Sequence, residues 1–139
     1  KAIYSGESIK IFNNGHMVRD FTYIDDIIES LFRLINKVPI KEKNYNKENL
    51  IPNESWAPYK ILNIGNSTPI QLMEYIEEIE KCIGIKAKKI YLPMQDGDVV
   101  STLSDSSKLE EYINYRPKTC ISQGIKEFIL WYKYFNKIY

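Results

Sequence analysis

The residues best suited to chemistry lie in two short stretches of the chain. The first runs from Gly15 to Asp26 and places Arg19 after a glycine turn and before an extended segment. A guanidinium is a planar fork that matches phosphate oxygens, so Arg19 is a candidate anion clamp. The alternative is an ion pair between Arg19 and Asp20 or Asp25, and the spacing alone favours this pair.

The second stretch is Gln95-Asp-Gly-Asp98. Gly97 allows the backbone to approach a ligand closely, because glycine carries no side chain and adopts most conformations. The amide of Gln95 and the carboxylate of Asp98 can orient hydroxyls or an imide. An ordinary acidic surface turn would account for the same four residues, and that reading is the more economical one on spacing alone.

Other patterns that usually mark an active site are missing from the sequence. No Gly-x-Gly-x-x-Gly or Gly-x-x-x-x-Gly-Lys run is present, and no tyrosine precedes a lysine by four positions. The sole histidine, His16, falls in a turn, where solvation explains it. Cys82 and Cys120 follow no metal or redox spacing and indicate a reducing compartment. We therefore expect no catalytic, cofactor-binding or metal site within this chain.

The overall composition is that of one globular domain. The chain has 139 residues, and its formal charge of +1 comes from 19 basic and 18 acidic residues. Such a balance does not favour nucleic acid or an anionic membrane. No secretory signal is recognisable, and no apolar run reaches the roughly 18 residues of a membrane span. We expect a cytoplasmic location.

The first half of the chain predicts a strand, a turn and a helix. Lys1–Gly6 is typical of the last turn of a helix that glycine ends, with the rest of that helix missing. Residues 8–12 alternate as a strand, and residues 13–15 supply a turn. Asp25 is a good N-cap for the helix that follows, which also explains the adjacent Asp26. The stripe of that helix comprises Ile27, Ile28, Leu31, Phe32 and Ile35.

The second half predicts further alternation of helices and strands after a surface insertion at residues 38–56. Residues 60–64 are compact and apolar, as in a strand, and Thr68-Pro-Ile-Gln71 has the pattern of a capping box. The helix that follows, with proline at its first position and a buried stripe of Leu72, Ile76, Ile79 and Ile83, should end at Gly84, and residues 87–92 should form another strand. Two more helices are expected, one capped by Asp105 and one starting near Thr119. This alternation predicts a small α/β fold.

Three stretches together resemble the extended short-chain dehydrogenase/reductases, within the NAD-dependent epimerases and dehydratases. They are Met17-Val-Arg-Asp-Phe-Thr-Tyr-Ile-Asp-Asp26, Ala57-Pro-Tyr-Lys-Ile-Leu-Asn-Ile-Gly-Asn-Ser67 and Leu92-Pro-Met-Gln-Asp-Gly-Asp-Val99. The branch that they resemble most is the UDP-glucuronate 4-epimerases of capsule and cell-envelope sugar synthesis. The resemblance implies that the whole chain, 1–139, is a carboxy-terminal nucleotide-sugar-binding domain without its Rossmann domain.

The resemblance also implies specific roles for residues of this chain. Arg19 matches an arginine that binds the diphosphate of the UDP-sugar, and Lys10, Ile11 and Phe12 match a strand beside the uracil. Gln95 and Asp98 belong to a loop that closes on the nucleotide. Catalytic residues and NAD are expected in the amino-terminal Rossmann domain, outside this chain. That domain is the expected protein partner, together with a second copy of the chain if the enzyme forms a homodimer.

Two alternatives to a 4-epimerase stay open. The same scaffold supports dehydration or decarboxylation of a nucleotide sugar, and a stand-alone binding module without activity would also fit. One departure is informative: many UDP-glucose epimerases have arginine where this chain has Gln95. Glutamine resembles the glucuronate branch and weakens the case for a phosphate contact at this position. On its own, the chain is expected to be inactive.

Overall fold

The computed structural model describes residues 1–41, 45, 48 and 51–138. The insertion predicted at 38–56 thus lies partly outside the described residues. The chain divides into two compact units. The first unit comprises residues 1–21, 68–103 and 119–139, and the second unit comprises residues 22–67 and 104–118.

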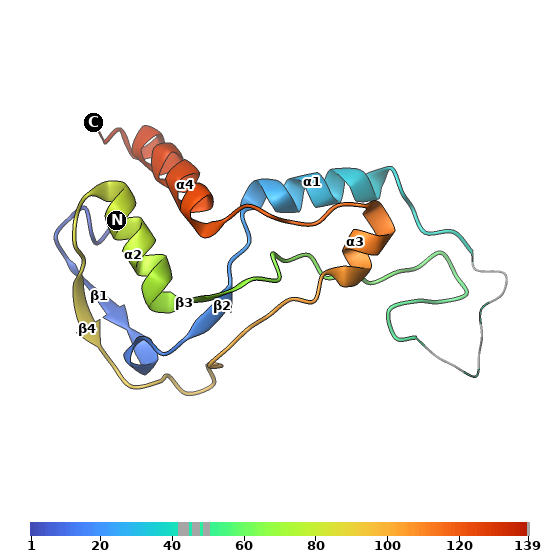
Figure 1. Ribbon diagram of the computed structural model, residues 1–139, viewed down its shortest axis with the longest axis horizontal. Helices are drawn as coiled ribbons and strands as arrows, with labels where there is room; N and C mark the ends of the chain where they lie inside the picture. The colour runs from blue at the N-terminus through green and yellow to red at the C-terminus, as the bar shows by residue number, and fades with distance from the viewer. Residues whose placement is uncertain (42–44, 46–47, 49–50, 139) are drawn as a thin grey trace. The chain divides into compact units, whose positions relative to one another are not determined.

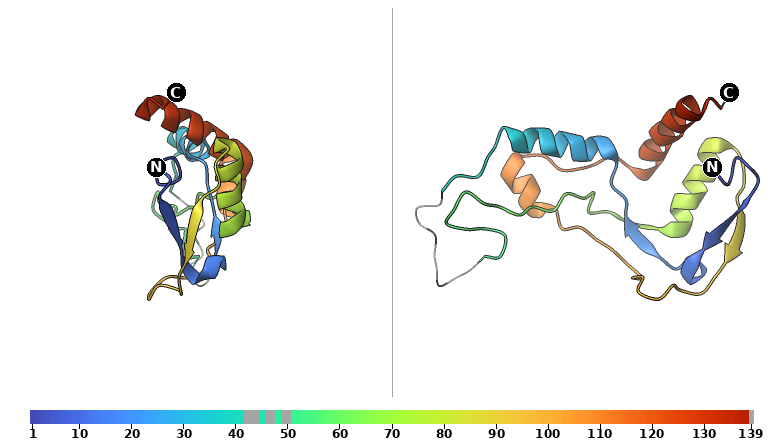
Figure 2. Two further views of the ribbon diagram at one scale, coloured as in Figure 1. Left: turned by 90° about the vertical axis from the view of Figure 1, so that its left-hand side faces the viewer. Right: turned by 180° about the vertical axis from the view of Figure 1, so that it is seen from behind.

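Within its described residues, the first unit holds two two-stranded sheets and the helices α2 and α4 (Figure 1). Strand β1 (Ser8–Ile11) pairs in parallel with β4 (Lys88–Tyr91), and the views of Figure 2 also show these strands side by side. Strand β2 (Val18–Asp20) pairs antiparallel with β3 (Pro69–Gln71). A 3₁₀ turn at Phe12–Gly15 joins β1 to β2.

Helix α2 (Leu72–Ile83) packs against α4 (Ile121–Asn136) in the first unit. Their shared core is made of isoleucines, which recur on one face of each helix at helical spacing. The buried members are Ile76, Ile125 and Ile129. Gly84 ends α2 in the left-handed conformation, φ 72°, and its amide donates to the carbonyl of Glu80 at 2.9 Å. The predicted helix and its glycine stop are confirmed.

The second unit contains α1 (Ile24–Ile35) and α3 (Ser107–Ile113), which pack together. Leu109 is fully buried and Ile113 nearly so. Ser106 ties the segment before α3 to Gly65, because its hydroxyl donates to the Gly65 carbonyl and accepts from the Gly65 amide, both at 2.9 Å. The predicted α/β class is therefore confirmed, with alternating short strands and helices.

Three local expectations are wrong. Asp25 is not the N-cap of α1, because the helix already starts at Ile24 and Tyr23 takes the cap position without a side-chain bond. Residues 61–64 form no strand, and Lys60 makes only an isolated bridge with Glu54. The Thr68-Pro-Ile-Gln71 pattern does not start a helix at Pro69 either, because Gln71 takes the cap position of α2. Pairing with β2 draws residues 69–71 into a strand, so α2 begins three residues after Pro69.

Two further sequence signals have counterparts in the structure, a turn at residues 2–6 and the start of α3. At the start of the chain, the Ser5 amide donates to the Lys1 carbonyl at 3.1 Å, a helix-type bond, and Gly6 is left-handed with φ 69°. Asp105 accepts the Ser107 amide at 3.0 Å, although Ser106 takes the cap position of α3. Among the described residues, no helix combines the length and the apolar character that crossing a membrane would require.

Candidate functional site

The candidate site is built where β2 meets the segment that follows the 95–98 loop. The Val18 amide donates to the Val100 carbonyl at 2.9 Å, and the Thr102 amide donates to the Val18 carbonyl at 3.1 Å. These bonds place residues 100–102 alongside β2 in a parallel orientation. This backbone pairing places the preceding loop, residues 95–98, next to Arg19.

Three hydrogen bonds hold the side chain of Arg19, two to backbone carbonyls and one to a carboxylate. Its Nη1 donates to the carbonyls of Val18 and Val100 at 2.8 and 3.1 Å. Its Nη2 donates to Oδ1 of Asp98 at 2.9 Å, forming an ion pair. The side chain of Arg19 is 24% exposed and that of Asp98 is 34% exposed, so solvent and a ligand can reach both charged groups.

Asp98 is fixed by a tight turn. Its amide donates to the Gln95 carbonyl at 3.2 Å, and Gly97 adopts φ 81°, a left-handed conformation that favours glycine. Asp98 Oδ1 also accepts the Val99 amide at 2.8 Å. A single carboxylate oxygen therefore binds both the guanidinium and the backbone of its own loop, which couples the position of Arg19 to that of the loop.

The structure brings Arg19 and Asp98 into direct contact. The spacing favoured a pair with Asp20 or Asp25, whereas the ion pair that the structure shows for Arg19 is with Asp98, a carboxylate 79 residues away. Sequence reasoning also missed the two valine carbonyls that hold Nη1, and no signal in the side chains could have indicated them. The arrangement can bind an anion if phosphate oxygens replace the Asp98 carboxylate as acceptors for the guanidinium.

Lys10, Ile11 and Phe12 lie on β1 and at the start of the turn that follows it. Ile11 is only 2% exposed, so its side chain belongs to the core. Its carbonyl accepts the Leu92 amide at 2.8 Å, which extends the β1–β4 pairing to the beginning of the loop. Lys10 is exposed and Phe12 is half-buried. These two side chains are thus better placed than that of Ile11 to face a ligand.

A metal or dinucleotide site has little support in this chain. In the part of the chain that the structure describes, no three His, Cys, Asp or Glu side chains gather as metal ligands. The six glycines of the sequence are widely separated and make no phosphate-binding fingerprint. The residues present do not fit NAD.

The model of a protein family described as GDP-mannose 4,6 dehydratase matches residues 2–128. The chain belongs to this family. The resemblance to NAD-dependent epimerases and dehydratases, with relatives named as UDP-glucuronate 4-epimerases, is thereby confirmed.

Two curated relatives are similar over nearly the whole chain. Protein CapI of Staphylococcus aureus is 41% identical over 99% of this chain and 41% of its own length. A probable UDP-glucuronate 4-epimerase of Rhizobium meliloti is 38% identical over 94% of this chain and 39% of its own. The chain thus spans about two fifths of the length of these family members.

A solved structure extends the likeness to three dimensions. UDP-glucuronic acid 4-epimerase from Bacillus cereus, in complex with UDP-glucuronic acid and NAD, is 27% identical with a TM-score of 0.72. The match covers 99% of this chain and 38% of the Bacillus cereus chain. This family member therefore contains the same fold within a longer protein.

Proposed function

We propose that this chain is the nucleotide-sugar-binding part of an NAD-dependent enzyme that epimerises UDP-glucuronate at C4. One observation supports this most: the likeness over 99% of the chain to the Bacillus cereus UDP-glucuronic acid 4-epimerase, whose structure contains that substrate and NAD. The role in capsule or cell-envelope polysaccharide synthesis is supported by the likeness to CapI. A cytoplasmic location fits such a role, because nucleotide sugars serve as activated donors there.

In this proposal, Arg19 binds the diphosphate. The guanidinium already has a fixed orientation through the Val18 and Val100 carbonyls, which use Nη1. Nη2 can exchange Asp98 for a phosphate oxygen, since both acceptors are anions and both positions are open to solvent. The released Asp98 carboxylate would then be available for a hydroxyl of the bound nucleotide, while Gly97 lets the loop approach it.

NAD is assigned to residues outside this chain, in the Rossmann domain that the family resemblance implies. When bound, NAD supplies reversible hydride transfer at the sugar. The contribution of the present chain is to bind and orient the nucleotide sugar and to shield it from water. These contacts are remote from C4, so they should stabilise the ground state and the transition state similarly.

A second candidate, 4,6-dehydration of a nucleotide sugar, is favoured by the description of the matching family model. The two candidates are separated by supplying the longer parent protein with UDP-glucuronate or GDP-mannose. Epimerisation yields UDP-galacturonate, whereas dehydration yields a 4-keto-6-deoxy sugar nucleotide. Exclusive formation of the 4-keto-6-deoxy product would replace the proposed function by the second candidate.

Arg19→Ala in the parent protein tests the role of this chain. Charge-assisted hydrogen bonds contribute roughly 1.5–3 kcal/mol each, so KM for UDP-glucuronate should rise by about ten- to a hundredfold. The effect on kcat should be smaller, because the lost contact is uniform. Arg19→Lys should restore only part of the affinity, because a point charge cannot replace the planar fork. An early-melting Arg19→Ala protein with an unchanged KM would contradict the assignment.

The isolated chain provides the complementary test. Incubated with UDP-glucuronate and NAD, it should form no product above a buffer control, because none of its residues fits the cofactor. Product formation would contradict the assignment of NAD and catalysis to residues outside this chain.

A further inference from the structure

The backbone at the start of the chain forms a Schellman motif. The Glu7 amide donates to the Ala2 carbonyl at 2.9 Å. The Gly6 amide donates to the Ile3 carbonyl at 3.2 Å, and Gly6 itself is left-handed with φ 69°. This pair of bonds around a left-handed glycine is the usual ending of an α-helix. Residues 1–5 therefore have the geometry of the last turn of a helix.

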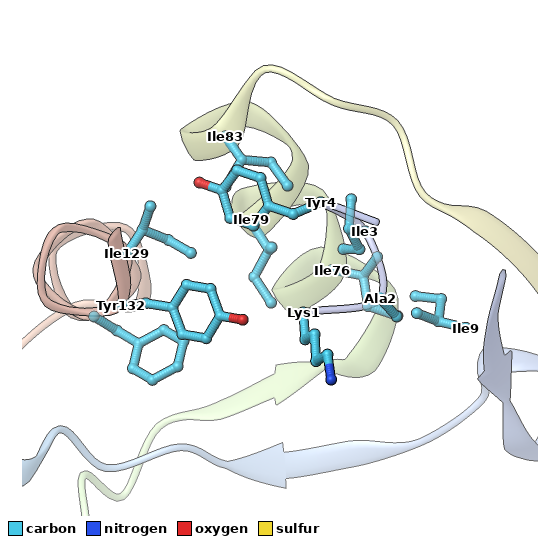
Figure 3. Close-up of a pocket in the computed structure, with 11 residues that line it drawn as sticks. Lys1, Ala2, Ile3, Tyr4, Ile9, Ile76, Ile79, Ile83, Ile129 and Tyr132 are labelled. Atoms are coloured by element: carbon cyan, nitrogen blue, oxygen red, sulfur yellow. The ribbon is translucent and has the colours of Figure 1, made fainter. Parts of the chain in front are cut away.

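The same turn forms one wall of an apolar groove in the first unit. The groove has a volume of about 250 Å³, and its other walls are mainly α2 and α4. Tyr4 stacks on Tyr132 of α4, with ring centroids 6.0 Å apart and planes 5° from parallel, which holds the turn against that helix. Figure 3 shows Lys1 between Tyr132 and Ile76 of α2. No residue of the candidate site lines the groove.

The groove is open to solvent although its lining is apolar. Phe128 of α4 lines it and is still 47% exposed. Removing such a side chain from water is favourable, so a further apolar element would gain stability by covering it. A cavity of about 150 Å³ holds a benzene molecule, and this groove therefore has room for at least one large apolar side chain.

Helix geometry indicates which element can cover the groove. A single helical turn is marginal by itself, because its first hydrogen bond fixes several residues at once, and further turns stabilise it. Side chains three and four positions apart lie on the same face of a helix. Residues three and four positions before Ala2 and Ile3 would therefore continue the face that already lines the groove. Such residues exist in longer family members, whose carboxy-terminal portion this chain matches.

We propose that, in the longer parent protein, the residues directly before Lys1 continue this helix and cover the groove with an apolar face. The occupant is an amphipathic helix of roughly 10–14 residues, the usual length in globular proteins, with apolar side chains recurring at helical spacing on the side of Ile3. The upstream helix, α2 and α4 then share one apolar core. The reaction that the parent protein catalyses has no part in this arrangement.

Hydrogen exchange in the parent protein tests the proposal directly. The backbone amides of the roughly ten residues before Lys1 should exchange at least about a hundredfold more slowly than those of an unstructured chain, because a helix packed on a core opens rarely. Mass spectrometry of peptides from this segment measures the rates. The readout needs no substrate, so its failure is distinguishable from a failure of the proposed enzymatic function.

Variants of α4 show whether the groove is the cause of this protection. Phe128→Lys places a charge in the groove and should speed exchange of the upstream amides about tenfold or more. Phe128→Ala is the milder variant if the lysine unfolds the parent protein, and about threefold to tenfold is expected. Leu130→Lys is the matched control, because Leu130 is 54% exposed on the same helix but does not line the groove. It should leave the rates unchanged.

Three results would overturn the proposal. The first is that the upstream amides are unprotected in the native parent protein. The second is that both Phe128 variants exchange like the native protein, and the third is that Leu130→Lys has the same effect as Phe128→Lys. If the amides are unprotected and sedimentation shows a dimer that Phe128→Lys dissociates, the groove binds a second copy of the protein instead.

Discussion

The phenol of Tyr115 donates a 2.7 Å hydrogen bond to Oδ1 of Asp26, a carboxylate only 5% exposed near the start of α1. The guanidinium of Arg33 lies 4.7 Å from the centre of the same ring. Burial, and then the bond to Asp26, raise the pKa of Tyr115 to about 12. One tyrosine thus fixes the segment after α3 to α1 by a polar and a cation–π contact.

Tyr115→Phe should lower the free energy of unfolding by about 1–3 kcal/mol, because a buried carboxylate loses a hydrogen-bond donor. Urea denaturation measures the change. Tyr134→Phe is the control, since that exposed side chain should contribute almost nothing. Equal stabilities of the two variants would show that the bond to Asp26 has no net value.

The same tyrosine should give the protein a defined alkaline transition. Its folded pKa of about 12 exceeds the ordinary value of 10.0, so its stabilising effect is complete below pH 10 and is lost as the pH rises toward 12. Ultraviolet titration should show one tyrosine that ionises near pH 12, and Tyr115→Phe should lack it. A native chain in which all tyrosines ionise near pH 10 would contradict this.

Glu80 should set the acid limit of the first unit. Its side chain is 1% exposed, bonds Lys86 at 2.8 Å and the Ala87 amide at 3.0 Å, and also pairs with Lys89. The bonds to Lys86 and Lys89 lower its pKa from 4.5 to about 2. The stabilisation is therefore present above pH 4.5 and is lost as the pH falls toward 2.

Glu80→Gln should destabilise the chain by about 1–3 kcal/mol at neutral pH and remove much of the pH dependence between 4.5 and 2. Thermal melting over this pH range measures both effects. Glu78→Gln is the control: its partner Lys81 is 67% exposed, so the change should stay within about 0.5 kcal/mol. A Glu80→Gln variant as stable as the native chain would show that the buried carboxylate merely offsets its own desolvation.

Gly15 should resist substitution for two reasons. It adopts φ 85°, and a Cβ there would lie 2.8 Å from Sδ of Met73. Gly15→Ala should cost about 1–3 kcal/mol, measured by urea denaturation. Gly6→Ala isolates the backbone contribution, because Gly6 has φ 69° but nothing within 4 Å of its Cβ position. If both variants lose the same stability, the contact with Met73 is of no consequence.

Helix α1 should cause self-association of the isolated chain. Its exposed apolar side chains are Ile24, Ile28, Leu31, Phe32 and Ile35, with Phe32 63% and Ile35 73% exposed. A contiguous apolar face of this kind favours association in water. Sedimentation velocity over a concentration series should show oligomers that Phe32→Lys reduces and Asn36→Lys, with the same added charge, does not. A chain that stays monomeric throughout would contradict the prediction.

Local sequence patterns predicted correctly those features that depend on a single element, such as the buried face and the end of a helix. The isoleucine stripe of α2 and the left-handed Gly84 needed no distant partner, and both were predictable. At Pro69 the local pattern predicted a helix start, but residues 69–71 pair with β2, which lies about 50 residues earlier in the chain, and α2 starts only at Leu72. Residues 61–64 have strand-like composition, but a strand also requires a neighbour, and the described residues provide none.

In the candidate site, too, residue types could be interpreted from the sequence, whereas contacts between distant segments could not. The types of Arg19 and Asp98 pointed to charged recognition, and both side chains are indeed reachable from solvent. Their contact could not be predicted, because it depends on residues 100–102 lying beside Val18. The hydrogen bond from Tyr115 to Asp26 was missed for the same reason: adjacent acids before a helix suggest capping, and the distant phenol leaves no local trace.

The segments of the two units alternate along the sequence, and this order determines which unit is complete first during synthesis. The second unit ends at residue 118, whereas the first unit needs residues 119–139 in addition to its two earlier segments. During elongation from the ribosome, the second unit is therefore complete once residue 118 has emerged, while the first unit still lacks α4. Helix α4 packs against α2, which lies far from it in the sequence, and contacts over such separations slow folding. The first unit, which carries Arg19 and Asp98, should be the last part of this chain to mature.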